Sequence, residues 1–331
     1  MAQKQTKSAA LPGVFATLGN GFELTTRYLW LIVIPAILDV FLWIGPRLSF
    51  RPLIESLSAQ LPPQPMLVDV MPLLEMFATR LNHFTYLSVS LLGVPALMTG
   101  LSPERTPIQP IIIERSGWGE WFGFAALFTL GGLLLAAVYF CLIAYALRRS
   151  GPAAGVAAPF SAARFIARAA RTWLRLAGLA VLLLILVIVI VFPVAIVAGF
   201  ASLLSQAIGT FVAFGGVILL IWLLMFFSYT PQGLTLNPRK FLPALGESVL
   251  IFRNNLPQSL NLLIVVILVR RILGFILLSV DVGTWLTGIN LLAHAYINTA
   301  VLMAMFIFYR DRYVSYLQGM QAQAVTEPVK N

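Results

Sequence analysis

The sequence is poor in the residue types that build catalytic and metal sites. Its 331 residues include one cysteine and two histidines, which excludes an intrachain disulfide and a cluster of thiol ligands for a metal ion. The single thiol, Cys141, lies inside the apolar run LLLAAVYFCLIAYAL. No Walker A, HExxH or GxSxG motif is present. We therefore expect no cofactor, no metal and no enzymatic activity.

Charged residues are also scarce, at 10% of the chain, whereas 60% of the residues are hydrophobic and the mean hydropathy is +0.91. Because soluble globular domains are less apolar and more charged, this composition predicts an integral membrane protein. The net charge of +10 does not indicate nucleic-acid binding, because the basic residues stand between hydrophobic runs and not on one solvated face. Membrane lipids, with anionic headgroups on the cytoplasmic side, are the expected partners.

Six apolar runs are long enough, or nearly so, to cross the roughly 30 Å of bilayer hydrocarbon, which takes about 20 residues. They are residues 28–45, 121–147, 174–199, 207–229, 256–280 and 285–309. The first run is the shortest, and Pro35 and Asp39 interrupt it. We expect an all-α fold in which residues 1–331 form a single membrane domain with six transmembrane helices arranged as three hairpins.

A seventh apolar segment, residues 84–100, is short and is broken by Gly93 and Pro95. If this segment does not cross, both termini and the loops 148–173 and 230–255 share one side, which then holds most of the lysines and arginines. By the positive-inside rule, that side is the cytoplasm. We therefore interpret 84–100 as a re-entrant or surface-lying segment, and we expect a multi-pass plasma-membrane protein with both termini cytoplasmic.

The long segment 46–120 is then external, and its prolines in LPPQP and SPERTPIQP indicate a loop-rich region. Within it, MLVDVMPLLEMFATRL has apolar residues at roughly helical spacing. This pattern predicts an amphipathic helix over residues 66–81 that lies on the membrane surface or caps the bundle. His83 is expected at the surface of the same loop.

Three similar segments precede the first, third and fifth spans: FATLGNGFELTTRYLW, FSAARFIARAARTWLR and FLPALGESVLIFRNNLP. Each starts with an aromatic residue and reaches an arginine shortly before the span. We interpret each as an amphipathic helix in the membrane interface, where aromatic side chains enter the headgroup boundary and arginines contact anionic lipid. The residues predicted to contact lipid are Arg164, Arg168, Arg171, Trp173 and Arg253.

A cytoplasmic amphipathic helix that ends in arginine and asparagine just before a span, as in FRNNLPQSL, resembles a group of bacterial six-span membrane proteins of unknown function. That group is similar to the membrane region attached to some glycerophosphodiester phosphodiesterases. The resemblance covers most of the spans and implies the six-span fold. In those phosphodiesterases a separate soluble barrel performs the chemistry, and this sequence does not contain it, so the resemblance implies no activity.

The fifth span, LLIVVILVRRILGFILLSV, carries Arg270 and Arg271 at its middle. Each arginine costs about 2.5 to 3.5 kcal/mol at a helix centre, which cancels most of the gain from the surrounding apolar residues. Three alternatives remain open: the side chains extend to the outer headgroups, one pairs with Asp39 of the first span, or they bind an anionic substrate.

The sixth span places Asn290, His294 and Asn298 on one helical face, at i, i+4 and i+8. These residues serve either as hydrogen bonds between helices or as a proton relay. Together with the fifth span they form the predicted intramembrane polar cluster: Asp39, Arg270, Arg271, Asn290, His294 and Asn298.

These features favour a non-enzymatic scaffold, sensor or assembly component of the membrane. The alternative is a transporter or permease component that uses the intramembrane cluster. A lipid enzyme would need paired reactive groups at headgroup level, and the external candidates Glu114, Glu120 and His83 show no such spacing.

Overall fold

The computed structural model describes residues 11–60, 71–89, 92–100, 102–150, 160–237, 241–279 and 282–326. Five helices in this part of the chain are long and apolar enough to cross a membrane. They are α5 (Trp118–Arg149), α6 (Ala162–Leu204), α7 (Gln206–Phe226) continued by α8 (Thr230–Leu236), α10 (Leu256–Leu278) and α11 (Thr287–Thr326). The predicted all-α membrane fold is confirmed.

The first span is bent. Helix α1 (Val14–Arg27) is followed by η1 (Leu29–Ile32) and α2 (Val33–Ile44), and the chain turns by 94° between α1 and the η1–α2 segment. If this bent pair is counted as one span, the number of spans is six, as predicted. The bend separates α1 from the short first span, and the interfacial position of α1 stays a prediction.

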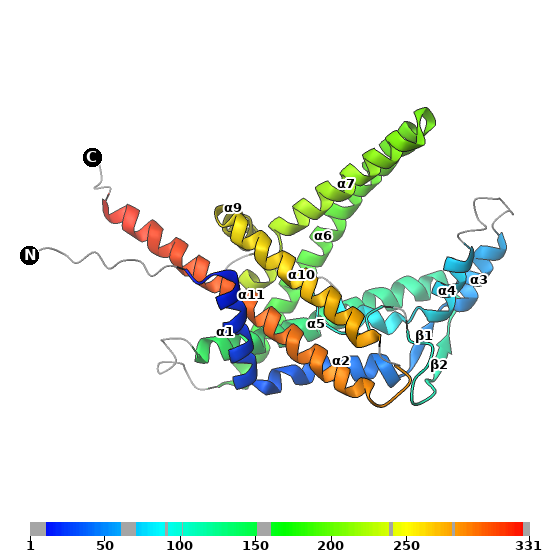
Figure 1. Ribbon diagram of the computed structural model, residues 1–331, viewed down its shortest axis with the longest axis horizontal. Helices are drawn as coiled ribbons and strands as arrows, with labels where there is room; N and C mark the ends of the chain where they lie inside the picture. Colours follow the sequence, from blue (N-terminus) through cyan, green and yellow to red (C-terminus); the bar gives the residue numbers. More distant parts are fainter. Residues whose placement is uncertain are drawn as a thin grey trace, which may run out of the picture.

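The two ends of the molecule consist of different secondary-structure elements (Figure 1). Helix α1 and the last turns of α11 lie at the left of the view, and we call this the basal end. At the right, the cap consists of α3 (Arg51–Gln60), α4 (Met71–Arg80), η3 (His83–Ser88) and a two-stranded sheet. Strand β1 (Arg47–Ser49) pairs in parallel with β2 (Ile112–Glu114), with Leu48 opposite Ile113.

Helix α11 forms the centre of the core. Of its apolar membrane segment, 78% is buried inside the protein, against 44% for α5. Aromatic rings pack within this core: Phe140 of α5 packs edge-on against Phe306 of α11 at 5.7 Å between ring centroids. On the other side of α11, Gly21 lets α1 approach closely, since a Cβ at this position would lie 2.8 Å from the Cβ of Ala304.

The hairpin of α6 and α7 contrasts with this core. It leans away from the other helices in Figure 1, and none of the apolar membrane segment of either helix is buried. At about 1.5 Å per residue, the 43 residues of α6 span about 64 Å, which is more than one bilayer crossing needs.

The three segments that are predicted to lie in the membrane interface are built differently. Helix α9 (Phe241–Asn254) is separated from α10, which has Pro257 in its first turn, a position where proline starts helices. The central basic segment, in contrast, continues without a break into the third span, so both are parts of α6. No helix-breaking residue stands between its last interfacial arginine and the apolar run.

The segment 84–100 does not form a spanning helix in its described residues. After η3 it continues as turns and irregular backbone, and Leu92, Val94 and Met98 are buried against the bundle. Gly132 of α5 provides room for the segment, because a Cβ there would lie 2.8 Å from the backbone carbonyl carbon of Leu87. This arrangement agrees with the re-entrant interpretation.

The predicted amphipathic helix over 66–81 is present as α4 over Met71–Arg80, where it packs on α3, and residues 66–70 lie outside the described residues. The expectation for His83 is wrong. Its side chain is fully buried, with the ring 4.3 Å from the rings of both Phe50 and Trp121. The aromatic residues that flank the loop in sequence close over the histidine once the cap folds.

Candidate functional site

Two groups of polar side chains lie among the helices. The first is the intramembrane cluster, which is centred on Asp39 of α2. One carboxylate oxygen of this fully buried residue, Oδ1, accepts the backbone N–H of Met98 at 3.0 Å. The other, Oδ2, lies 3.3 Å from Nδ1 of His294 on α11. Asp39 therefore ties the re-entrant segment and α11 to the first span.

The polar side chains of α11 continue this cluster along one helical face. Asn298 is buried and donates to the carbonyl oxygen of His294 at 3.1 Å. The next residue, Thr299, shares a 2.8 Å hydrogen bond with the hydroxyl of Tyr139 on α5. Asn290, nearer the start of α11, donates instead to the carbonyl oxygen of Leu277 on α10 at 2.9 Å. Asn290 and Thr299 thus link α11 to its neighbours.

The arginines of α10 do not join Asp39. The alternative in which Arg270 pairs with Asp39 is wrong, because the carboxylate meets Met98 and His294 and no ion pair connects it to Arg270 in the described chain. Arg270 is partly buried with Nε unpartnered among the described residues, and Arg271 is exposed. The sequence indicates how deep each charge lies, but not which helices are neighbours.

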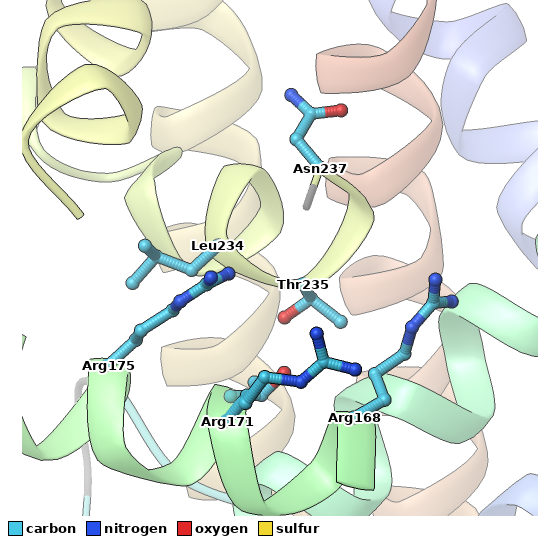
Figure 2. Close-up of a pocket in the computed structure, with 7 residues that line it drawn as sticks. Arg168, Arg171, Arg175, Leu234, Thr235 and Asn237 are labelled. Atoms are coloured by element: carbon cyan, nitrogen blue, oxygen red, sulfur yellow. The ribbon is translucent and has the colours of Figure 1, made fainter. Parts of the chain in front are cut away.

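The second group lines a small pocket between α6 and α8, with a volume of about 50 Å³. We call it the basic pocket. Figure 2 shows the side chains of Arg168, Arg171 and Arg175 projecting from α6 on the side that lines the pocket. Their i, i+3, i+7 spacing puts all three on one face of the helix. The other lining residues are Thr172, Leu234, Thr235 and Asn237.

The α8 wall of the basic pocket is held firmly. Leu234 and Thr235 are buried, and the Thr235 hydroxyl donates to the carbonyl oxygen of Pro231 at 2.7 Å. The Asn237 amide donates to the carboxylate of Glu247 at 3.1 Å and to the hydroxyl of Tyr309 at 3.0 Å. In Figure 2 this amide points away from the arginines. The wall is therefore fixed to α9 and α11.

The arginines lack counterions. None of the three lies within 4.0 Å of a carboxylate in the described ranges. Arg171 donates one N–H, from Nε, to the carbonyl oxygen of Ala167 at 3.0 Å, which leaves its four terminal N–H groups for other partners. The basic pocket thus concentrates three positive charges whose donors are available to a ligand.

The other predicted lipid contacts lie outside the pocket. Arg164 is exposed one turn before it, and Arg253 is exposed in the last turn of α9. The indole N–H of Trp173 donates to the carbonyl oxygen of Leu130 at 3.0 Å, so this side chain also anchors α6 to α5.

Sequence reasoning missed five residues that line the pocket: Thr172, Arg175, Leu234, Thr235 and Asn237. The spacing of Arg175 from Arg171 carried a signal, because residues four apart share a helix face. No pattern in the sequence connects the last turn of α8 with the start of α6. That contact arises only when α8 packs inside the bundle.

Among the described residues, no group of three or more histidine, cysteine, aspartate or glutamate side chains could hold a metal ion. A scan of family models and searches of curated proteins and of solved structures find no match to this chain. The resemblance to bacterial six-span proteins therefore stays a prediction, and the site is interpreted from its geometry.

Proposed function

We propose that this protein is a non-enzymatic membrane scaffold or sensor that binds an anionic lipid headgroup in the basic pocket. One observation carries the proposal: Arg168, Arg171 and Arg175 line one small pocket, and none of them has a carboxylate partner among the described residues. Basic pockets between membrane helices are typical sites for anionic headgroups.

The energetics favour a bound anion. Like charges three or four residues apart destabilise a helix by roughly 0.2 to 0.5 kcal/mol per pair. An anion between the guanidinium groups removes this repulsion and accepts paired hydrogen bonds from each planar fork. The arrangement is therefore more stable with its ligand than without it.

The surroundings of the pocket favour a lipid as the source of the anion. Leu174, between two of the arginines, is 64% exposed, and exposed apolar side chains continue along α6 at Val181 and Leu184. Acyl chains can lie along this surface while the headgroup occupies the pocket. Arginine beside an exposed apolar face is typical of helices at the headgroup boundary.

This function requires a defined orientation in the membrane. The basal end faces the cytoplasm of a plasma-membrane protein, where anionic lipids attract basic segments. A cysteine introduced at the exposed Ala162 should then resist an impermeant maleimide on intact cells, whereas one at the exposed Glu114 in the cap should react. The native Cys141 is buried and should not react with the maleimide. Labelling at position 162 and not at 114 would overturn the orientation.

Lipid binding is tested by thermal unfolding of the full chain in detergent with added lipid. Anionic lipid should raise the Tm of the wild-type protein more than a zwitterionic lipid of equal chain length. The variant Arg171→Gln should lose most of this gain. Arg253→Gln is the matched control, since it removes one exposed charge outside the pocket. An equal loss in both variants would show that the pocket is not the binding site.

A transport role is the second candidate, and Arg270 favours it. The Nε atom of this residue is buried without a partner in the described chain, on a helix that is otherwise almost wholly apolar. A transporter should conduct phosphate or chloride across proteoliposomes in a manner that Arg270→Gln abolishes while folding is kept. Equal flux with and without the protein would remove this candidate.

A further inference from the structure

We infer that the basic pocket selects a phosphate monoester headgroup, as in phosphatidic acid, over the phosphodiester headgroups of other anionic lipids. This inference rests on the proposed lipid-binding function and names the ligand of the same pocket. Three features of the pocket carry it: its size, the number of its guanidinium groups, and one buried hydroxyl group.

The size of the pocket fits a bare phosphate. A single water-sized probe needs about 10 to 15 Å³, so a volume of about 50 Å³ holds roughly four such positions. A phosphate monoester presents three terminal oxygens and one ester oxygen. A phosphodiester carries a second substituent, for which a volume of this size leaves no further space.

The number of arginines also favours the monoester. Each guanidinium fork binds best to a pair of oxygens on one phosphorus. Three terminal oxygens form three such pairs, one for each of Arg168, Arg171 and Arg175, whereas a diester has two free oxygens and a single pair. A monoester also carries about −1.5 to −2 charges near pH 7, because its second pKa is near 6. It therefore balances the three positive charges better than a diester with one negative charge.

Thr172 adds a neutral donor to the lining of the pocket. Its hydroxyl is buried and accepts a weak hydrogen bond from the thiol of Cys141, with 3.7 Å between sulfur and oxygen. The hydroxyl hydrogen has no acceptor among the described residues, although helical threonines commonly donate to the carbonyl four residues earlier. This hydrogen is available to a ligand oxygen. Thr235 cannot act in the same way, because its hydrogen is bonded to Pro231.

The test measures binding of phosphatidic acid and phosphatidylglycerol, with equal acyl chains, to the full chain in neutral detergent by native mass spectrometry. We expect an apparent Kd at least about tenfold lower for phosphatidic acid, since an added hydrogen bond between charged groups is worth about that factor. The affinity for phosphatidic acid should rise from pH 5 to pH 8 as its phosphate loses the second proton. The affinity for phosphatidylglycerol should stay constant, because arginine remains charged throughout.

Variants separate this inference from the proposed function. Arg171→Lys keeps the charge and the fold but loses the fork, so it should reduce the preference for phosphatidic acid while anionic lipids still bind. If Arg171→Gln weakens both lipids equally and the wild-type protein shows no preference, the monoester inference fails and lipid binding in the pocket stands. If Arg171→Gln weakens neither lipid more than Arg253→Gln does, both proposals fail.

A competition experiment distinguishes a lipid headgroup from soluble phosphate as the ligand of the pocket. Inorganic phosphate in the presence of zwitterionic lipid should compete only weakly with phosphatidic acid, because it makes no contact with the apolar surface of α6. Competition at concentrations close to those of the lipid would overturn the lipid headgroup and assign the pocket to a soluble phosphate.

Discussion

The intramembrane cluster and the basic pocket differ in how their charged side chains are partnered. Asp39 accepts a backbone N–H through Oδ1, and its Oδ2 lies 3.3 Å from an imidazole nitrogen of another segment, so both oxygens face polar groups of the protein. Arg168, Arg171 and Arg175 lie side by side on one face of α6, with no carboxylate partner in the described chain. A buried carboxylate with partners in the protein supports the fold. Three neighbouring arginines without a counterion favour a bound anion instead.

The largest effect is expected for Asp39→Ala. Removing this carboxylate leaves the N–H of Met98 and the imidazole of His294 without their partner inside the bundle, and such losses cost about 3 to 5 kcal/mol. Denaturant unfolding of the purified protein would measure the change. Asp39→Asn is the control, because its amide oxygen can still accept from Met98 and should cost less. Equal stability of wild type and Asp39→Ala would show that the cluster does not support the fold.

His83 differs from both sites, because its buried side chain is uncharged. Burial lowers the pKa of His83 from the usual 6.5 to about 4, so the side chain is neutral in the folded cap at neutral pH. As pH falls from 6.5 to 4, the unfolded chain binds the proton more readily than the folded one, and stability falls. The shift corresponds to about 3 kcal/mol, and the loss levels off below pH 4.

Fluorescence of Trp121, whose ring lies against His83, would report this change in an acid titration of the cap. His83→Leu should remove the dependence between pH 4 and 6.5 while the rest of the acid transition is kept. A wild-type cap that is equally stable at pH 6.5 and pH 4.5 would contradict the prediction.

The sequence predicts local features of this protein better than it predicts neighbours. Length and hydropathy are sufficient to place the spans, and the arginine-rich segment of α6 is visible from its spacing. The broken segment 84–100 is correctly identified as non-spanning because Gly93 and Pro95 disrupt a helix. These predictions rest on periodicity and composition within a single segment.

The partners of each polar residue could not be predicted in the same way. Depth in the membrane suggested Arg270 for Asp39, but the partner is His294, because α11 and not α10 provides the residue that reaches the carboxylate. His83 was expected at the surface, because nothing in the sequence shows that Phe50 and Trp121 close over it. Such contacts depend on how helices are arranged, which no local pattern determines.

A double-mutant cycle tests the corrected partner. Asp39 and His294 lie 3.3 Å apart, so we expect a coupling free energy of about 0.5 to 3 kcal/mol between Asp39→Asn and His294→Gln. The same cycle with Arg270→Gln should give a coupling within about 0.5 kcal/mol of zero, as for residues without a shared partner. Strong coupling to Arg270 and none to His294 would restore the prediction made from depth.

The smallest effect is expected in the basic pocket when no anion is present. Arg171→Gln should leave the unfolding free energy in zwitterionic detergent unchanged or raise it by roughly 0.2 to 0.5 kcal/mol, because it removes repulsion with Arg168 and Arg175. This is the reverse of the result for Asp39, although both variants remove one charge. If Arg171→Gln instead destabilises the lipid-free protein by more than about 1 kcal/mol, Arg171 already has a structural partner, and the contrast between the two sites disappears.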